Sequence, residues 1–194
     1  MSLQERVYSV LVVSAAENFN SSIQALLPDA KFSPVIYESS VSTAKRLLLE
    51  RPFDFVIINS PLPDDTGVRF AIDVCSERGG VALLMVRTEV YTAIYDKVAE
   101  YGVYVLQKPM GKPTVLQAID WMVATRERLR KLEKKTVSIE DKMLEIRAVN
   151  RAKWLLIDKE GMTEADAHRH VEKLAMDKCI SKRDVAEEII RAYS

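Results

Sequence analysis

Few side chains in this sequence stand where they could do chemistry together. Asn59 ends an apolar run, a loop with Asp64 and Asp65 follows it, and Lys108 comes directly before Pro109. An amide is a poor nucleophile and carries no charge to hold a hard cation. No nucleophile stands beside a base, and no cluster of residues has the spacing of a metal site. The sequence therefore predicts a protein that is not an enzyme and has no cofactor.

Composition excludes a partner that is attracted by bulk charge. The chain has 194 residues, of which 48% are hydrophobic, and its 28 basic residues balance its 28 acidic ones. Any surface for a nucleic acid must therefore be a local patch. Cys75 and Cys179 belong to no CxxC or metal spacing, which favours buried, reduced thiols. No apolar run approaches the roughly 20 residues that span a bilayer, and no signal peptide is visible, so we expect a cytoplasmic protein without membrane contact.

The first 110 residues alternate two hydrophobic patterns. Strand-like runs cover residues 7–13, 34–37, 53–58, 81–86 and 103–106, and helix-like spacing covers 19–27, 41–50, the stretch from 68 to about 77, and 90–101. Such alternation with buried strands predicts a doubly wound, five-stranded parallel sheet of the flavodoxin-like type. Sites in such sheets lie at the carboxyl ends of the strands, which are the ends to inspect for function.

After Pro113 the pattern is helical only. From Thr114 the chain can run as one helix for more than 40 residues. Residues spaced three and four apart in it give the a and d positions of a coiled coil, at Leu129, Leu132, Thr136, Ile139, Met143, Ile146 and Asn150. In a parallel dimer the flanking g and e′ positions would pair Arg128 with Glu133 and Lys135 with Glu140, which is favourable, and Lys142 with Arg147, which is not. The pattern favours a homodimer over a helix packed on its own chain, the alternative that remains open.

The C-terminal segment predicts a small bundle of three helices, the first shared with the coiled coil. Gly161 suits the position just beyond a helix, and Thr163 and Ser181 each open a further helix with an aspartate three residues on. The predicted apolar faces are Ala148, Ala152, Leu155 and Leu156, then Ala167, Val171, Leu174 and Ala175, then Val185, Ala186, Ile189 and Ile190.

The N-terminal half resembles the receiver domains of response regulators over about residues 6–125. The resemblance rests on the stretch 54–67, which is similar to the strand and turn that hold a receiver's phosphoacceptor, and on Lys108-Pro109 after the fifth strand. A receiver needs an acidic pair, an acceptor Asp, a Ser or Thr, a Lys and an aromatic residue. Those positions fall here at Ser14 and Ala15, Asn59, Val86, Lys108 and Val105. Four of the required functional groups are thus replaced, and Tyr104 is expected on the opposite face of its strand from Val105.

These replacements predict a receiver-like domain without phosphorylation chemistry. Asp54 precedes its strand and so lies at the wrong end of the sheet, and Asp64 and Asp65 lack partner carboxylates for a tight Mg²⁺ site. Lys108 is then expected to hydrogen-bond Asn59 or nearby carbonyls and hold the loops.

The C-terminal segment resembles the ANTAR domain, a three-helix module of transcription antitermination regulators, over about residues 133–192. The match is carried by Ala152-Lys153, the start of the second helix, Ala175-Met176 and Val185-Ala186, and Trp154 departs from it where many members have Gly. The resemblance implies binding to paired RNA hairpins in nascent transcripts, which prevents a terminator from forming.

The candidate RNA-binding residues are cations for phosphates and rings for unpaired bases. They are Arg151, Lys153, Arg169, Lys173, Lys182 and Arg183, with Trp154, His168 and His170. Residues 141–194 hold 11 basic and 11 acidic side chains, so bulk attraction is absent there, whereas residues 126–135 hold six basic and two acidic ones.

We expect a receiver-like domain over residues 1–125, a coiled-coil linker helix over 126–150 and an ANTAR-like RNA-binding domain over 133–194. The expected function is that of a signal-responsive antitermination regulator that binds RNA hairpins as a dimer, independently of aspartyl phosphorylation. The alternative is a regulator whose receiver-like domain binds a sensor protein or small ligand and whose output is protein interaction. A DNA-binding regulator is disfavoured because no helix-turn-helix signature is present.

Overall fold

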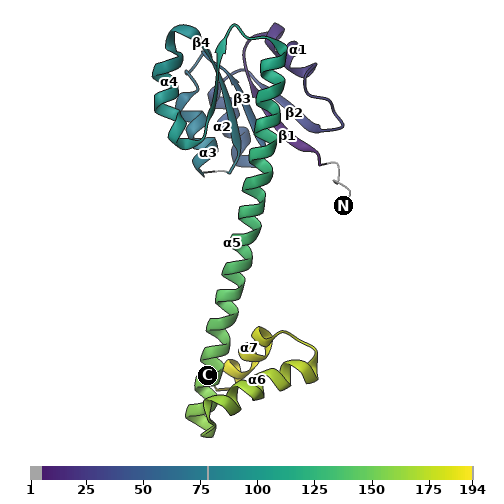
Figure 1. The fold of residues 1–194 in the computed structure, drawn as a ribbon, viewed down its shortest axis with the longest axis vertical. Coiled ribbons are helices and arrows are strands. Elements are labelled where there is room, and N and C mark those ends of the chain that lie inside the picture. Colours follow the sequence, from purple (N-terminus) through teal and green to yellow (C-terminus); the bar gives the residue numbers. More distant parts are fainter. Residues whose placement is uncertain (1–5, 78, 194) are drawn as a thin grey trace. The chain divides into compact units, whose positions relative to one another are not determined.

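The central strands of the N-terminal half are runs of branched and aromatic residues with almost no solvent exposure, so they must be covered on both faces. In the computed structural model, which describes residues 6–77 and 79–193, they lie in one sheet (Figure 1). Residues 1–5, 78 and 194 of the expected domains lie outside the described residues. The strands are β1 (Tyr8–Val13), β2 (Phe32–Glu38), β3 (Phe55–Asn59), β4 (Val81–Arg87) and β5 (Tyr104–Lys108).

The sheet confirms the predicted fold class. Its five strands lie in the order β2-β1-β3-β4-β5, and every neighbouring pair is parallel. The register pairs Val13 with Ile58, Asn59 with Met85, and Arg87 with Lys108. The carboxyl ends of β1, β3 and β5 therefore meet at one edge, as the doubly wound topology requires.

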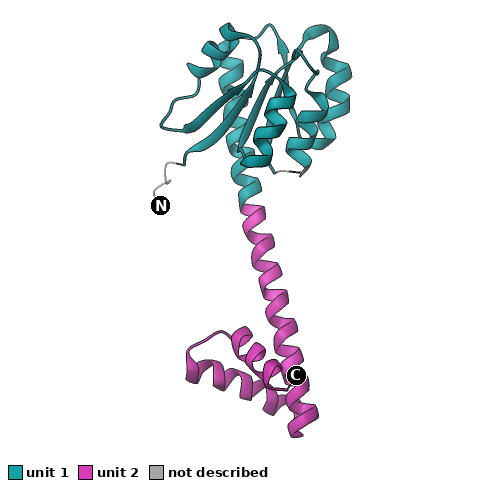
Figure 2. Ribbon diagram, turned by 180° about the vertical axis from the view of Figure 1, so that it is seen from behind, with its two compact units in different colours: residues 1–130 teal, residues 131–194 magenta. Residues whose placement is uncertain are grey.

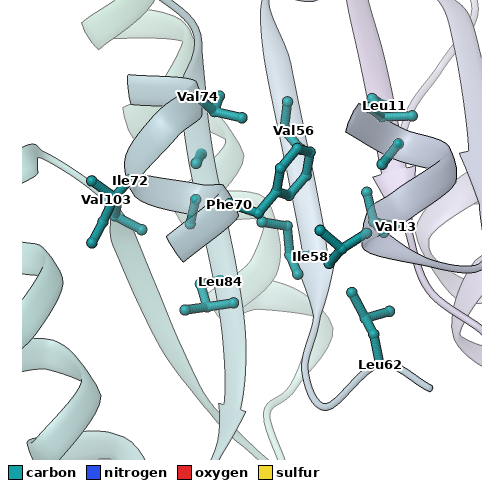
Figure 3. Packing of buried hydrophobic residues seen from close by; sticks show 14 of the residues in the cluster. Leu11, Val13, Val56, Ile58, Leu62, Phe70, Ile72, Val74, Leu84 and Val103 are labelled. Atoms are coloured by element: carbon teal, nitrogen blue, oxygen red, sulfur yellow. The ribbon is translucent and has the colours of Figure 1, made fainter. Parts of the chain in front are cut away.

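Helices cover both faces of this sheet. Helices α2 (Val41–Glu50), α3 (Val68–Glu77) and α4 (Tyr91–Val98) pack on the face that carries Leu11, Val56 and Ile58. Figure 3 shows Phe70 of α3 lying against β3 beside Val56. Helix α1 (Glu17–Gln24) and the first turns of α5 (Lys112–Glu160) cover the other face, on which Val10, Val12 and Ile57 lie. Between them the two layers bury every central strand.

The remaining helices build a second, separate core. The chain divides into two compact units, residues 1–130 and 131–194, coloured separately in Figure 2. In the second unit, the end of α5 packs with α6 (Glu164–Lys178) and α7 (Lys182–Tyr193). The predicted apolar faces are confirmed except at Leu155, which is half-buried and is not part of this core. The packed residues are Ala148, Ala152, Leu156, Ala167, Val171, Leu174, Ala175, Val185, Ala186, Ile189 and Ile190.

Local capping sets the ends of these helices where the sequence predicted them. The Thr163 hydroxyl accepts the backbone N–H of Asp166 and donates to its carboxylate, and Ser181 and Asp184 repeat this arrangement. Gly161 follows α5 with φ +68°, a left-handed conformation that glycine adopts without steric cost. These caps satisfy backbone groups that a short helix would otherwise leave unpaired.

Two details differ from the sequence predictions. The helix expected over residues 90–101 is a shorter α4 flanked by 3₁₀ turns at Thr88–Val90 and Ala99–Tyr101. Cys179 was expected to be buried, but it is exposed because it ends α6 in the left-handed conformation. Cys75 is partly buried, and that burial raises the pKa of its thiol.

A buried carboxylate fastens α5 to the sheet within the first unit. Asp54 Oδ1 accepts hydrogen bonds from Arg126 Nε at 3.0 Å and from an Arg130 guanidinium nitrogen at 2.7 Å. Its Oδ2 accepts the Ser9 N–H at 3.1 Å and the Ser9 hydroxyl at 3.2 Å. Burial raises the pKa of Asp54, but the hydrogen bonds from Arg126 and Ser9 and the two guanidinium charges outweigh it, so the pKa is lowered.

We predict that Asp54→Asn lowers the free energy of unfolding by about 2–3 kcal/mol at neutral pH, because it removes the carboxylate charge that two partly buried guanidinium groups share. The lowered pKa means that the contribution of Asp54 is complete above the unfolded value near 3.9 and is lost as the pH falls through the folded value. Urea unfolding followed by circular dichroism should therefore show the two proteins converging in strong acid.

The matched control is Asp120→Asn, which removes the exposed Lys31–Asp120 pair. Such a surface pair contributes about 0–1 kcal/mol. An equal loss of stability in both variants at neutral pH would contradict the anchoring role of Asp54.

Candidate functional site

The carboxyl ends of three strands hold a chain of neutral and cationic side chains. Lys108 Nζ, at the end of β5, donates to Asn59 Oδ1 at 2.7 Å. The Asn59 amide donates to Ser14 Oγ at 3.0 Å, and Ser14 Oγ also accepts the Ala16 N–H at 3.1 Å. This is the contact expected for Lys108. Its charge is met by amide and backbone oxygens where a receiver has carboxylates.

Lys108 is held by its surroundings on both sides. Its ammonium group also donates to the Ser60 carbonyl, and its own carbonyl accepts the Thr88 hydroxyl at 2.8 Å. Burial and the nearby Arg87 charge lower the pKa of Lys108. The sequence reasoning did not single out Thr88, although a hydroxyl two residues beyond Val86 was the available signal.

The side chains of β4 and β5 confirm which face each predicted residue occupies. Val86 is buried against the α2–α4 face, and Val105 packs on the same face. Tyr104 points to the other face, where its hydroxyl lies 2.6 Å from the Thr125 hydroxyl of α5. The aromatic ring of β5 is therefore tied to α5 and does not face the strand-end chain.

The loop carboxylates are already used by the backbone. Asp64 accepts the N–H groups of Val41 and Ser42 at the start of α2, at 3.0 and 2.9 Å, and Ser42 also donates its hydroxyl. These hydrogen bonds, led by that from the Ser42 N–H, lower the pKa of Asp64. Asp65 accepts the N–H of Gly67 at 2.7 Å. Within the described residues, no group of three or more His, Cys, Asp or Glu side chains could hold a metal ion.

Most of the candidate RNA-binding cations in the second unit take part in ion pairs. Lys153 bonds to Glu164 at 3.1 Å, and Arg169 to Asp166 at 2.7 Å. The Glu172 carboxylate pairs with Lys182 at 2.6 Å and lies 3.4 Å from His168. The hydrogen bond from Lys182 and its charge are the main causes that lower the pKa of Glu172. Arg183 pairs with Glu187 at 3.0 Å. The remaining candidates form no ion pair with a described residue: Arg151, Lys173 and Trp154 are exposed, and His170 is half-buried.

The predicted dimer seam is an exposed apolar stripe. The solvent-exposed fractions are 50% for Leu132, 49% for Ile139, 49% for Met143 and 59% for Ile146. Thr136 and Asn150 are exposed as well, whereas Leu129 is half-buried and packs against the sheet core of the first unit. Large apolar side chains in a row at this exposure are typical of a surface that binds a partner.

Trp154 lies on the same stripe, beyond its predicted end. Steps of four, four and three residues lead from Ile146 through Asn150 to Trp154 and Ile157, which keeps one face of an α-helix. Trp154 is 67% exposed and Ile157 is 37% exposed. The ring is therefore not part of the core, and the continued spacing was the signal for its place on the stripe.

Known proteins match each of the two units. Residues 138–190 match the family model of the ANTAR domain. Two sequences of the transcriptional regulatory protein PdtaR, from two strains of Mycobacterium tuberculosis, are each 28% identical over 144 residues, or 73% of this chain and 69% of theirs.

Solved structures match the first unit. The signal receiver domain of an HD domain-containing protein from Pseudomonas fluorescens Pf-5 is 20% identical with a TM-score of 0.57, and 68% of this chain covers 96% of it. A protein named adenylate cyclase from Rhodopirellula baltica is 18% identical with a TM-score of 0.59, over 68% of this chain and 98% of that one. The HemR receiver domain from Leptospira biflexa is 21% identical with a TM-score of 0.52, over 60% and 94%. These identities show the fold alone.

The chain carries an ANTAR domain, and its first unit has the fold of receiver domains, which together is the domain organisation of an ANTAR-domain response regulator. The receiver domain is the first unit, and residues 138–190 of the ANTAR domain lie within the second. The relatives that match this chain are named as regulatory proteins. None of the helices in residues 6–77 and 79–193 combines the length and hydropathy needed to cross a bilayer.

We predict that Lys108→Met in the receiver domain lowers the free energy of unfolding by about 1–2 kcal/mol, because Asn59 and the Ser60 carbonyl lose their donor. Urea unfolding measures the loss. Lys45→Met is the control, since Lys45 is exposed on α2 and forms no ion pair with a described residue. If both variants kept the stability of the unmodified chain, Lys108 would not be the structural tie described above.

Proposed function

We propose that the chain is a dimeric regulator that binds RNA hairpins in nascent transcripts and prevents transcription termination, with an input that does not use aspartyl phosphate. The observation that carries the proposal is the match of residues 138–190 to the ANTAR domain. The likeness to PdtaR, a transcriptional regulatory protein, supports the same class of output.

The exposed stripe of α5 supports a dimer of two copies of this chain. From Leu132 to Ile146 its apolar a and d residues are about half exposed in the single chain, and an identical stripe is their natural complement. The g positions Arg128, Lys135 and Lys142 are all basic. Of the e positions that they would face, Glu133 and Glu140 are acidic and Arg147 is basic, so two of the three pairs are favourable. A parallel pair brings g beside e′, whereas an antiparallel pair brings g beside g′ and repels. Parallel association follows, and it gives the dimer two ANTAR domains for two hairpins.

The exposed cations are the groups free to meet RNA. Arg151 and Lys173 form no ion pair with a described residue, and Arg183 keeps further N–H donors beside its bond to Glu187. Lys153 is mostly covered by its pair with Glu164, so we assign it to the packing of α5 on α6. Trp154 is assigned to the seam because it continues the stripe.

The neutral strand-end chain supports an input other than phosphorylation. Ser14 and Asn59 supply no carboxylate, and Lys108 is bonded to Asn59 and Ser60. A receiver-domain switch of this kind has to respond to a bound sensor protein or small ligand, because no group here can accept a phosphoryl group and hold Mg²⁺.

Incubation with acetyl phosphate and Mg²⁺ is expected to leave the intact mass of the chain unchanged. The physical reason is that the Asn59 amide, and the Ser14 hydroxyl to which it is hydrogen-bonded, replace the nucleophilic and metal-binding carboxylates. Mass spectrometry of the intact protein reads this directly, and a receiver with a complete acidic site serves as the positive control. The gain of one phosphoryl group would overturn the proposed independence.

Met143→Glu is expected to break the dimer. It places two carboxylates across the seam, which should raise the dimer dissociation constant at least about 100-fold, or roughly 3 kcal/mol. Sedimentation at several dilutions measures the mass. The unmodified dimer should also bind an RNA of two linked hairpins more tightly than either hairpin alone, since the second contact is intramolecular, and the variant should lose that preference.

Leu144→Glu is the matched control. Leu144 neighbours Met143 on α5 and is 45% exposed, but it occupies a b position away from the seam. It should leave mass and RNA preference unchanged. Equal effects of the two substitutions would contradict the seam, and a dimer that binds neither RNA at low salt would contradict the RNA-binding function.

A further inference from the structure

One side of α5 in the second unit carries a row of unpaired cations. Lys131 and Lys134 occupy c and f positions of the heptad, and Lys135 and Lys142 occupy g positions, so all four project from one flank of the helix. All are exposed, and none forms an ion pair with a residue in the described ranges 6–77 and 79–193. Most cations of α6 and α7, by contrast, form ion pairs, Lys173 excepted.

Acidic residues of the same turns lie on the other flank. Glu133 and Glu140 occupy e positions, which lie on a different side of the helix from the c and f positions. From Lys131 to Glu140, therefore, the helix presents cations on one side and carboxylates on the other. This separation creates a local field that the zero net charge of the chain conceals.

The basic flank borders an open groove. A hollow of about 380 Å³ lies between α5 and the start of α7, with Lys134 and Lys142 on one wall and Arg183 on the other. Asp141 and Glu145 also line it. Lys131, Lys134 and Lys135 precede these two carboxylates, and Lys142 lies between them. The groove lies wholly within the second unit.

The seam leaves this flank accessible. The a and d residues point away from positions c and f, so a second copy on the stripe does not cover Lys131, Lys134 or the groove. Lys131 and Lys142 are about 16 Å apart along the helix axis at 1.5 Å per residue. That length spans several phosphate steps of a nucleic-acid strand.

We propose that the basic flank, Lys131, Lys134, Lys135 and Lys142 with Arg183 across the groove, binds the phosphate backbone of the hairpin stem. The inference rests on the proposed RNA-binding function and extends the RNA site from the ANTAR helices onto the linker helix. Lysine ammonium groups act as point charges toward phosphates, and the flank carries no ring on which a base could stack. Its contacts are therefore independent of RNA sequence.

The test compares Lys131→Gln/Lys134→Gln with the unmodified dimer on two synthetic RNAs, a two-hairpin RNA and the same RNA with scrambled loops. Lys135 and Lys142 are left intact because they flank the seam. Because both chains of the dimer carry the two substitutions, four phosphate contacts are lost on each two-hairpin RNA. The slope of log K against log salt should therefore become shallower by about 2.8–3.6, and affinity at about 0.1 M salt should fall at least about 100-fold on both RNAs. Arg183→Gln should reduce the slope by about one contact per chain.

Lys45→Gln/Lys97→Gln is the charge-matched control, since both lysines are exposed on the receiver domain and form no ion pair with a described residue. It should leave affinity and slope unchanged. Three outcomes would overturn this inference alone. They are an unchanged salt slope in the Lys131/Lys134 variant, a loss of affinity only for the RNA with intact loops, and an equal loss of affinity in the control variant. Failure of the unmodified dimer to bind either RNA would instead overturn the proposed function.

Discussion

Helix α5 has to serve three apolar surfaces in succession, and the rest of the structure depends on how its faces are divided. Val115, Ala118, Ile119 and Met122 cover the sheet, and Ala148, Ala152 and Leu156 enter the core with α6 and α7. Between them, the residues from Leu132 to Ile146 have no core to enter. Because an α-helix completes one turn every 3.6 residues, the stripe and the later core positions lie on different sides of α5. A second chain can therefore cover the stripe while α6 and α7 keep their place.

The receiver domain replaces charge with hydrogen bonds at its strand ends. In a receiver with carboxylates, like charges close together repel unless a cation joins them. Here Ser14, Asn59 and Lys108 satisfy one another without an added ion, and Asp64 and Asp65 are taken up by backbone N–H groups. The loops are consequently ordered by groups that the chain itself supplies.

Much of the fold was predictable because its signals are local. Buried runs gave the strands, and the Thr163–Asp166 and Ser181–Asp184 spacings gave two helix starts, since each cap involves residues three apart. Interactions between distant segments were not predictable in the same way. Asp54 meets Arg126 and Arg130 more than 70 residues later, and Asp64 caps a helix that begins at Val41. The replacements at the strand ends could be predicted from residue types alone. Which cations form ion pairs could be seen only in the structure.

The exposed stripe of α5 bears on what controls the activity of such a regulator. If two copies pair along the stripe as proposed, and no covalent mark controls them, the proportion of paired chains would follow mass action and depend on how many copies a cell contains. At low copy number the paired form grows with the square of the amount made. Synthesis and turnover of the chain would then act as inputs in their own right, and a sensor bound to the receiver domain would tune a threshold already set by gene dosage.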